Sequence, residues 1–354
     1  MIGFFFLSLS SNAQDCERKL KIAGEKYISG HLRNIPMLLN GCINNGFTAK
    51  QKESAYELVV LSYLFLDDVG AAEKNLIELL TANPDYRPSP LDPPEYIHFF
   101  NNFRVDPVFG YGFILGPNFT LLKDVEYLTV GSSKLLDATS NGGLGFAGMF
   151  AFDMKIIKNV ELNMNFGFSS KRFKIKEELY TATLEGGYFN TIQSTERQFW
   201  MDIPVTIKYG IKSNQNLYAY IQGGVAFHKL LADKLELTRA IVEGRIVDGP
   251  AVPILADPNH VSLRKNEHYS LIVGAGVKYK IAMGLYAVAD LKFYSGLAQL
   301  ANKEAAIDER PVLNYKYGYA DNYFNQSTLS LSFGIAKMIY KPKRIKRGGK
   351  LIQE

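Results

Sequence analysis

The chain has 354 residues, of which 47% are hydrophobic and 21% charged, and its formal net charge is +5. This length is enough for one sizeable domain and a smaller one. No run of 18 or more consecutive apolar residues occurs, which excludes ordinary transmembrane helices. If the protein lies in a membrane, it must cross as a closed barrel, because lipid leaves no backbone polar group unpaired.

The first residues have the pattern of a secretory signal. Ile2–Leu9 form a short apolar run, and Ser10–Gln14 supply a small-residue cleavage site, although no Lys or Arg precedes the run. We therefore predict a signal peptide over residues 1–14. Cys16 raises the alternative of a lipoprotein, but the three residues before it make a poor lipidation site. In an exported protein, Cys16 and Cys42 either pair or remain two unrelated thiols, and the sequence leaves both possibilities open.

Residues 15–104 have a helical pattern and predict a small all-α domain. Within it, Ala55 to Tyr86 follow the spacing of a tetratricopeptide repeat, with large residues on a first helix, a turn at 67–70 and the small Ala72 on a second helix. A small side chain at Ala72 lets the two helices approach each other closely. A weaker half-match precedes this repeat. Two repeats are fewer than a free-standing array needs, so we expect this domain to lean on a barrel or on a partner.

A further short helix is predicted after Asp92, and its aromatic residues lie on one face. Two roles fit this face. It either caps the exposed end of the repeats or docks a partner. The candidate partner-binding residues of the helical domain are Tyr56, Tyr63, Tyr96, Phe99 and Phe100.

Residues 105–341 consist of alternating hydrophobic and polar segments. Strands are expected near 107–119, 143–153, 160–168, 199–211, 217–230 and 326–340, with two more that meet at 282–284. Tight turns at 156–159 and 213–216 alternate with long polar connections at 122–141, 176–197, 232–267 and 300–322. This rhythm predicts an up-and-down membrane β-barrel of about eight antiparallel strands in an outer membrane.

The alternation also predicts which side chains fill the barrel. Period-2 spacing turns one set toward lipid and the other toward the lumen, where carboxylates and ammonium groups balance. Such a set favours a packed, salt-bridged interior over an open pore. The predicted lumen residues are Glu161, Asp202, Lys208, His228, Lys278, Asp290 and Lys292.

With both termini in the periplasm, the long connections face outward, and the helical domain shares the periplasmic side with the basic tail 342–354. Such a tail suggests lipid head groups or an acidic partner rather than nucleic acid.

One strand carries a family resemblance. Trp200–Tyr209, with the letters WMDIPVTIKY, resembles the acidic-Ile-Pro strand followed by Lys-Tyr or Lys-Phe of the porin-like outer-membrane barrels of Bacteroidota, which include the PorT type of the type IX secretion system. The resemblance implies an outer-membrane location and, more weakly, a role in protein secretion. The helical domain and the basic tail depart from the simplest members of that family. Because proline is unfavourable inside a strand, we expect a bulge at Pro204.

Catalytic patterns are weak in this sequence. The glycine spacing of 143–148 lies inside a predicted strand and lacks the following helix of a nucleotide site. His228 and Asp202 could meet in the lumen, where a structural hydrogen bond is the simpler interpretation. We therefore expect a non-catalytic protein without a cofactor or metal, whose partners are outer-membrane lipid and periplasmic or outer-membrane proteins. Two alternatives remain, an adhesion barrel that acts through its outer connections and an outer-membrane hydrolase that uses His228, His260 or His268.

Overall fold

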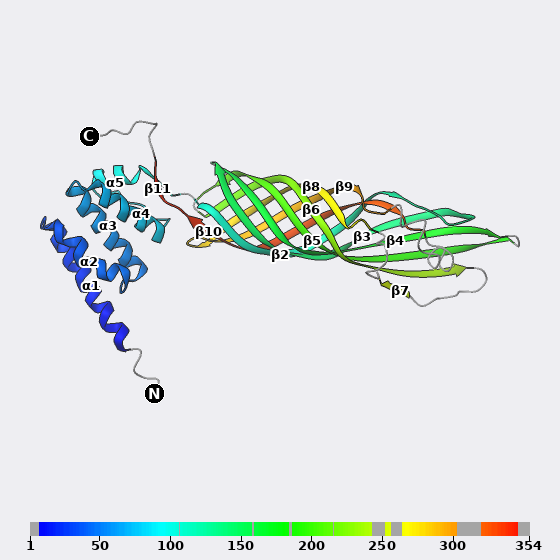
Figure 1. Cartoon of the computed structure of the whole chain (residues 1–354), viewed down its shortest axis with the longest axis horizontal. Helices are drawn as coiled ribbons and strands as arrows, with labels where there is room; N and C mark the ends of the chain where they lie inside the picture. Colours follow the sequence, from blue (N-terminus) through cyan, green and yellow to red (C-terminus); the bar gives the residue numbers. More distant parts are fainter. Residues whose placement is uncertain are drawn as a thin grey trace. The chain divides into compact units, whose positions relative to one another are not determined.

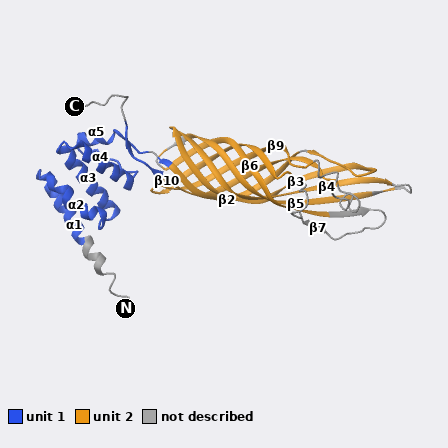
Figure 2. Cartoon of the chain, in the orientation of Figure 1, with its two compact units in different colours: residues 1–108, 339–354 blue, residues 109–338 orange. Residues whose placement is uncertain are grey.

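The computed structural model forms two compact units, residues 1–108 with 339–354 and residues 109–338, which we name the helical unit and the barrel unit (Figure 2). The structure describes residues 7–105, 107–157, 159–183, 186–214, 216–242, 252–255, 264–302 and 320–345.

The helical unit contains five α-helices and one 3-10 turn within the described residues (Figure 1). The ends of two of these helices follow local capping rules. The Thr48 hydroxyl accepts a hydrogen bond from the Gln51 N–H, while the Gln51 side chain accepts one from the Thr48 N–H. Asp68 accepts from the Ala71 N–H at 2.9 Å. The elements are α1 Leu7–Ile28, the turn Leu32–Asn34, α2 Ile35–Asn44, α3 Ala49–Phe65, α4 Val69–Ala82 and α5 Pro94–Phe100.

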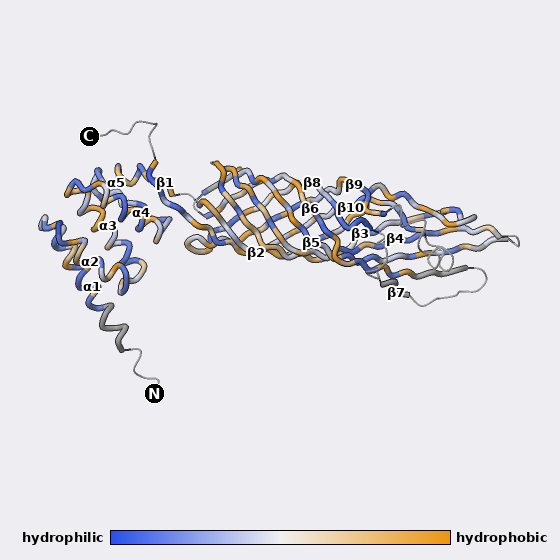
Figure 3. Tube along the Cα trace, in the orientation of Figure 1, coloured by the Kyte–Doolittle hydropathy of each residue, from blue (hydrophilic) through white to orange (hydrophobic). Residues whose placement is uncertain are grey.

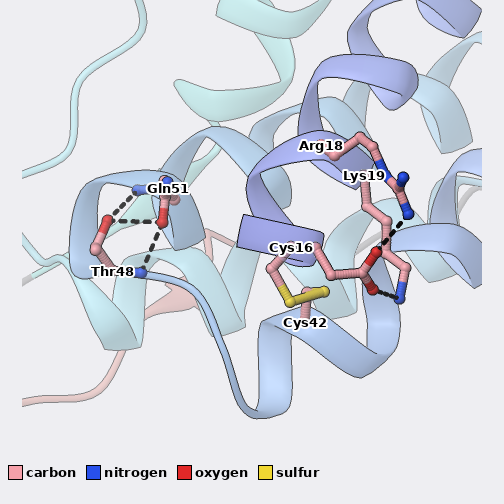
Figure 4. The surroundings of a disulfide bond; sticks show 7 residues. Cys16, Arg18, Lys19, Cys42, Thr48 and Gln51 are labelled. Atoms are coloured by element: carbon pink, nitrogen blue, oxygen red, sulfur yellow. Dashed lines mark hydrogen bonds and ion pairs between the residues drawn. A yellow bond between two sulfur atoms is a disulfide. The ribbon is translucent and has the colours of Figure 1, made fainter. Parts of the chain in front are cut away.

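One hydrophobic core holds these helices together, and the predicted contact of α3 with α4 lies in it. Val59, Ala72 and Leu76 are all buried, so the small Ala72 sits where the helices approach each other. Of the two possibilities left open for Cys16 and Cys42, the structure has the paired one. The two residues form a disulfide that joins α1 to α2 (Figure 4). A sulfur bonded in this way is not available for a lipid. The signal-peptide boundary at residue 14 stays a prediction.

The barrel unit is a ring of eight antiparallel strands. Each strand pairs with its neighbours in the order β5-β4-β3-β2-β10-β9-β8-β6, and the pairing of β5 with β6 closes the ring. The short strand β7, Val252–Leu255, pairs antiparallel with residues 234–237 of β6. This confirms the predicted fold class. The ring strands are β2 Pro107–Glu126, β3 Ser133–Ile157, β4 Val160–Thr183, β5 Gly186–Ser213, β6 Leu217–Val242, β8 Glu267–Ala282, β9 Leu285–Gln299 and β10 Tyr323–Tyr340.

Four of the strands continue well past the closed ring (Figure 1). Residues 176–197 were predicted to be a long polar connection, but β4 and β5 pair in register through this segment as far as Thr183 and Gly186. The prediction was wrong here because apolar side chains on the inner face, among them Leu179 and Ile192, bury one another. We name 133–142, 171–183, 186–198 and 232–242 the strand extensions. The predicted connections 122–141 and 232–267 were wrong in the same way, because β2 reaches Glu126, β3 begins at Ser133 and β6 continues to Val242. Residues 243–251, 256–263 and 303–319 of the predicted connections lie outside the described residues.

The bulge expected at Pro204 is absent. The ladder between β4 and β5 skips the positions opposite Ile203 and Pro204, then resumes at Asp202 in an unchanged register. A missing N–H therefore leaves a gap in the ladder without inserting a residue. The shifts in the pairing of β5 with β6 fall elsewhere, between Phe199 and Trp200 and near the end of β5.

A two-stranded ladder within the helical unit joins the chain before the barrel to the chain after it. Strand β1, Phe103–Arg104, pairs antiparallel with β11, Lys343–Arg344. The Ile345 N–H donates to the Asn102 carbonyl at 2.7 Å, and Arg344 forms an ion pair with Glu73 of α4 at 2.9 Å. The start of the predicted basic tail is thus held by the helical unit, while residues 346–354 lie outside the described part.

Candidate functional site

The outer wall of the ring is apolar. Hydrophobic and polar residues alternate along the strands of the ring, as the colours of Figure 3 show. The large hydrophobic side chains are exposed on the outside, and the polar residues between them are buried. Phe150, Val273 and Phe333, for example, are 57%, 62% and 51% exposed. An apolar surface that extends over all the ring strands is unfavourable in water and matches the lipid-facing band of a transmembrane barrel. Separately, no helix in the described residues is long and apolar enough to cross a membrane.

The structure places all seven predicted lumen residues inside the ring. Six of them are buried, and the seventh, Glu161, has a side chain that is 12% exposed. They do not pair only among themselves, because Asp153 of β3 lies between two of their ammonium groups. Lys208 Nζ lies 2.8 Å from one carboxylate oxygen of Asp153, and Lys278 Nζ lies 3.1 Å from the other. Lys278 also reaches Glu161 at 2.6 Å.

Asp153 was not among the predicted lumen residues, although the alternation along its strand indicates an inward position. It shares the inward phase of Ala151 and Met149, but it ends the predicted strand at the turn and was not assigned a face. A second carboxylate, Asp290, accepts hydrogen bonds from Tyr220 at 2.5 Å and from Gln222 at 3.0 Å. The interior of this part of the ring is therefore a packed polar network.

His228 and Asp202, predicted to meet, do so and also reach a serine. His228 Nδ1 lies 2.6 Å from Asp202 Oδ1, and its Nε2 lies 2.8 Å from Ser270 Oγ. This order of groups can activate a serine for acyl transfer. Here Ser270 is only 2% exposed. The cavity beside the chain, lined by Lys171, Asp202 and His228, has about 10 Å³, which is room for a single water molecule. The space suits a structural hydrogen-bond chain better than a substrate.

A cluster that sequence reasoning did not find lies between the strand extensions. Arg264 forms two-pronged ion pairs with Glu196 and with Asp321 at 2.5–2.9 Å, and its guanidinium lies 4.7 Å from the Phe324 ring centre. Its partners lie 68 and 57 residues away in the chain, so no local sequence pattern predicts these ion pairs. These contacts fasten the segments before β8 and β10 to the inside of β5.

Beside the Arg264 cluster, Glu177 accepts a hydrogen bond from the Asn322 amide. Glu177 belongs to the extension of β4, outside the lipid-facing band. Burial raises the pKa of Glu177 to about 7. This carboxyl therefore gains and loses its proton near neutral pH.

The helical unit contains a groove of about 740 Å³ between α2, α3 and α4. Tyr56 and Tyr63, two of the predicted partner-binding residues, line it. We name the following residues the groove residues: Arg33, Met37, Asn40, Tyr63, Lys74, Asn75 and Glu78.

The other three candidates of the helical unit, Tyr96, Phe99 and Phe100, are buried in its core. Tyr96 donates a hydrogen bond to the Tyr86 hydroxyl at 2.8 Å, and the Phe100 ring packs on that of Tyr86. Their burial fits the capping alternative and leaves no surface for the docking alternative, because α5 covers the core with this face. Among the described residues, no group of three or more His, Cys, Asp and Glu side chains is placed to hold a metal ion.

Comparisons with known proteins find similarity among solved structures only. No protein-family model and no curated protein match the sequence. Neisserial surface protein A is 10% identical over 66% of this chain and 98% of its own, with a TM-score of 0.29.

The outer membrane protein OprG of Pseudomonas aeruginosa is 10% identical over 65% and 96%, with a TM-score of 0.29. The outer membrane protease OmpT of Escherichia coli is 9% identical over 66% and 98%, with a TM-score of 0.27. At such scores the likeness does not bear on function, and the barrel rests on the chain's own strand pairing.

Proposed function

We propose that this chain is a non-catalytic outer-membrane barrel whose helical unit binds a periplasmic protein, as a subunit of a secretion or assembly complex. The observation that carries this proposal is the open groove of the helical unit. The resemblance of Trp200–Tyr209 to barrels of the PorT type, and that of Ala55–Tyr86 to a tetratricopeptide repeat, point the same way.

The membrane location is supported by the apolar wall of the closed ring. A barrel has no strand edge to leave unpaired in lipid, so the ring meets the condition for spanning a bilayer. Barrels of this type place short turns in the periplasm. The tight turns near Asn159 and Gly284 lie at the same end of the ring as the start of β2 and the end of β10, which supports periplasmic termini.

The chemistry of the groove suits an extended segment of a protein. The Asn40 and Asn75 side chains offer amide donors and acceptors that can pair with a peptide backbone. Met37 is 79% exposed and offers a flexible apolar contact. Arg33, Lys74 and Glu78 add charges of both signs, so specificity would come from matched side chains on the partner.

The test is co-purification from outer membranes in mild detergent, followed by mass spectrometry. Met37→Glu and Lys74→Glu change the groove, whereas Leu91→Glu and Lys50→Glu make the same changes at exposed sites of the helical unit outside it. The proposal expects one stoichiometric partner with the parent chain and both controls, and its loss with both groove variants. A partner retained by the groove variants, or a barrel that always purifies alone, would refute it.

The strand extensions favour one second candidate, a surface-binding barrel. Four strands reach beyond the lipid-facing band, and with periplasmic termini they would lie outside the cell. If cells that display the chain bind a surface or ligand, and shortening β4 and β5 at 174–195 abolishes this binding while the groove variants keep it, this candidate replaces the first.

A further inference from the structure

Basic side chains form a row across the outer face of the strand extensions. The pairing of β4 with β5 sets Arg172 opposite Arg197, and the pairing of β5 with β6 sets Arg197 opposite Lys234. Lys174, two residues beyond Arg172 on the same face, is exposed. We name these four the basic row. Like charges directly opposite each other in a sheet repel, so the row costs stability unless an anion lies against it.

The carboxylate recorded in ion pairs with this row is Glu236, which lies 3.7 Å from Arg197 and 3.0 Å from Lys234 through its two oxygens. In the described part of the chain, Arg172 and Lys174 form no ion pair, and Arg172 Nε has no hydrogen-bond partner. The row therefore keeps an excess of positive charge, and one of its guanidinium N–H groups is buried without a partner.

An aromatic groove of about 410 Å³ lies directly beside the basic row, on the lipid-facing wall. Phe168 stacks on Phe199 with ring centres 5.8 Å apart, and Phe113 packs on Phe150 at 5.3 Å. The groove exists because Gly148 has no side chain between its outward neighbours on β3. Its six aromatic lining residues are Phe113, Phe146, Phe150, Phe166, Phe168 and Phe199.

The two features share strands and a face. On β4 the outward positions run Phe168, Ser170, Arg172, and Ser170 pairs with Phe199 of β5. Two residues of a strand span about 6.6 Å, so the basic row begins within about 14 Å of the groove. One molecule that carries both a phosphate and a hydrocarbon chain can touch both features, with the phosphate at the membrane edge.

We propose that the basic row and the aromatic groove form a binding site for a phosphorylated lipid of the leaflet next to the strand extensions. Arginine matches phosphate oxygens with two parallel N–H donors, and the lysines add charge. The acyl chain fills the groove over Gly148. A bound phosphate also relieves the repulsion along the row. This inference needs only that the barrel spans a membrane and is independent of a protein partner.

The experiment uses the full chain in detergent micelles and titrates dioleoyl phosphatidic acid, with bound lipid counted by native mass spectrometry. Arg172→Gln/Lys174→Gln removes two charges of the row, and Lys21→Gln/Lys50→Gln removes two exposed charges of the helical unit. A basic residue at a membrane surface contributes about 1 kcal/mol, so we expect roughly thirty-fold weaker binding for the first pair and no change for the second. Equal binding by both pairs would overturn the proposal.

Two further arms separate the parts of the site. Gly148→Leu fills the groove, and the first added carbon meets only the Phe113 ring at 3.6 Å, an ordinary contact. It is expected to weaken binding of phosphatidic acid. Dioleoylglycerol, which lacks the phosphate, is expected not to compete. If inorganic phosphate alone binds as tightly as the lipid, or if dioleoylglycerol competes equally, no phosphorylated-lipid site exists. Heat-dependent gel mobility confirms that each variant is folded.

Discussion

Replacing Asp153 by Asn should destabilise the barrel strongly, because this carboxylate lies between Lys208 and Lys278. Both lysines are 2% exposed, and Lys278 keeps Glu161 as an ion-pair partner after the change, whereas Lys208 loses the carboxylate with which it forms an ion pair. Removing one member of a buried ion pair costs about 3–5 kcal/mol, since the other charge stays buried without compensation. We expect a loss of this size in the free energy of unfolding.

The measurement is equilibrium urea unfolding of the refolded barrel in micelles, followed by tryptophan fluorescence. Trp200 is the only tryptophan and is fully buried in the barrel unit, so it reports on this unit alone. Asp137→Asn, on the same strand but exposed, is the matched control and should change little.

A second substitution tests the cause of this loss. Lys208→Met in the Asp153→Asn background removes the orphaned charge and should recover much of the lost stability. If Asp153→Asn unfolds at the same urea concentration as the Asp137→Asn control, the lumen charges do not stabilise the fold as argued.

Three other perturbations have definite expected outcomes. Cys16→Ser/Cys42→Ser should cost the helical unit about 3.5 kcal/mol in thermal unfolding, since the bridged cysteines are 26 residues apart. Glu177→Gln should raise barrel stability by up to about 3 kcal/mol at pH 8 and by little at pH 5. The pKa of Glu177 is raised from 4.5 to about 7, so the folded state binds the extra proton and loses stability as pH rises through that window. A fluorophosphonate should not label Ser270, because Ser270 is buried.

Each of these has an outcome that contradicts it. Reductant that leaves the melting temperature of the helical unit unchanged would show that the disulfide does not constrain it. If Glu177→Gln changes the free energy of unfolding equally at pH 5 and pH 8, burial does not raise the pKa of Glu177 as argued. Labelling that Ser270→Ala abolishes would reopen the hydrolase alternative for the Asp202–His228–Ser270 chain.

The ring strands could be predicted because one rule governs them, with apolar side chains out and polar side chains in. On β4, Phe166 and Phe168 point out while Asn163 and Asn165 point in, and this phase is plain in the sequence. The same phase placed the seven lumen residues. What it could not supply was pairing across the ring, because Arg264 and its partners come from segments far apart in the chain.

The strand extensions escaped prediction because they obey the opposite rule. Beyond Ser170 on β4 the outward residues become Arg172 and Lys174, while Phe173 and Ile175 turn inward and are buried. A strand that leaves lipid for water must exchange its faces in this way, because its outer side is now hydrated. A prediction that expects apolar side chains on the same face along the whole strand takes this segment for a polar loop. The change from outward apolar to outward charged residues after Ser170 instead marks the edge of the lipid-facing band.

The two outer strands of the extensions, β3 and β6, change phase in a different way. On β6 the pairing steps from Leu230 opposite Trp200 to Ala232 opposite Phe199, so Leu231 is an extra residue. One inserted residue turns every later side chain to the other face. It brings Leu235 and Leu237 inward, where they pack with Leu179 and Ile192 of β4 and β5. On β3 a register shift between Gly142 and Ala147 falls at a similar level. The inner strands thus exchange residue types and the outer strands exchange register. Both changes place apolar side chains such as Leu179 and Leu235 beside the buried Arg264 cluster, beneath a charged outer face.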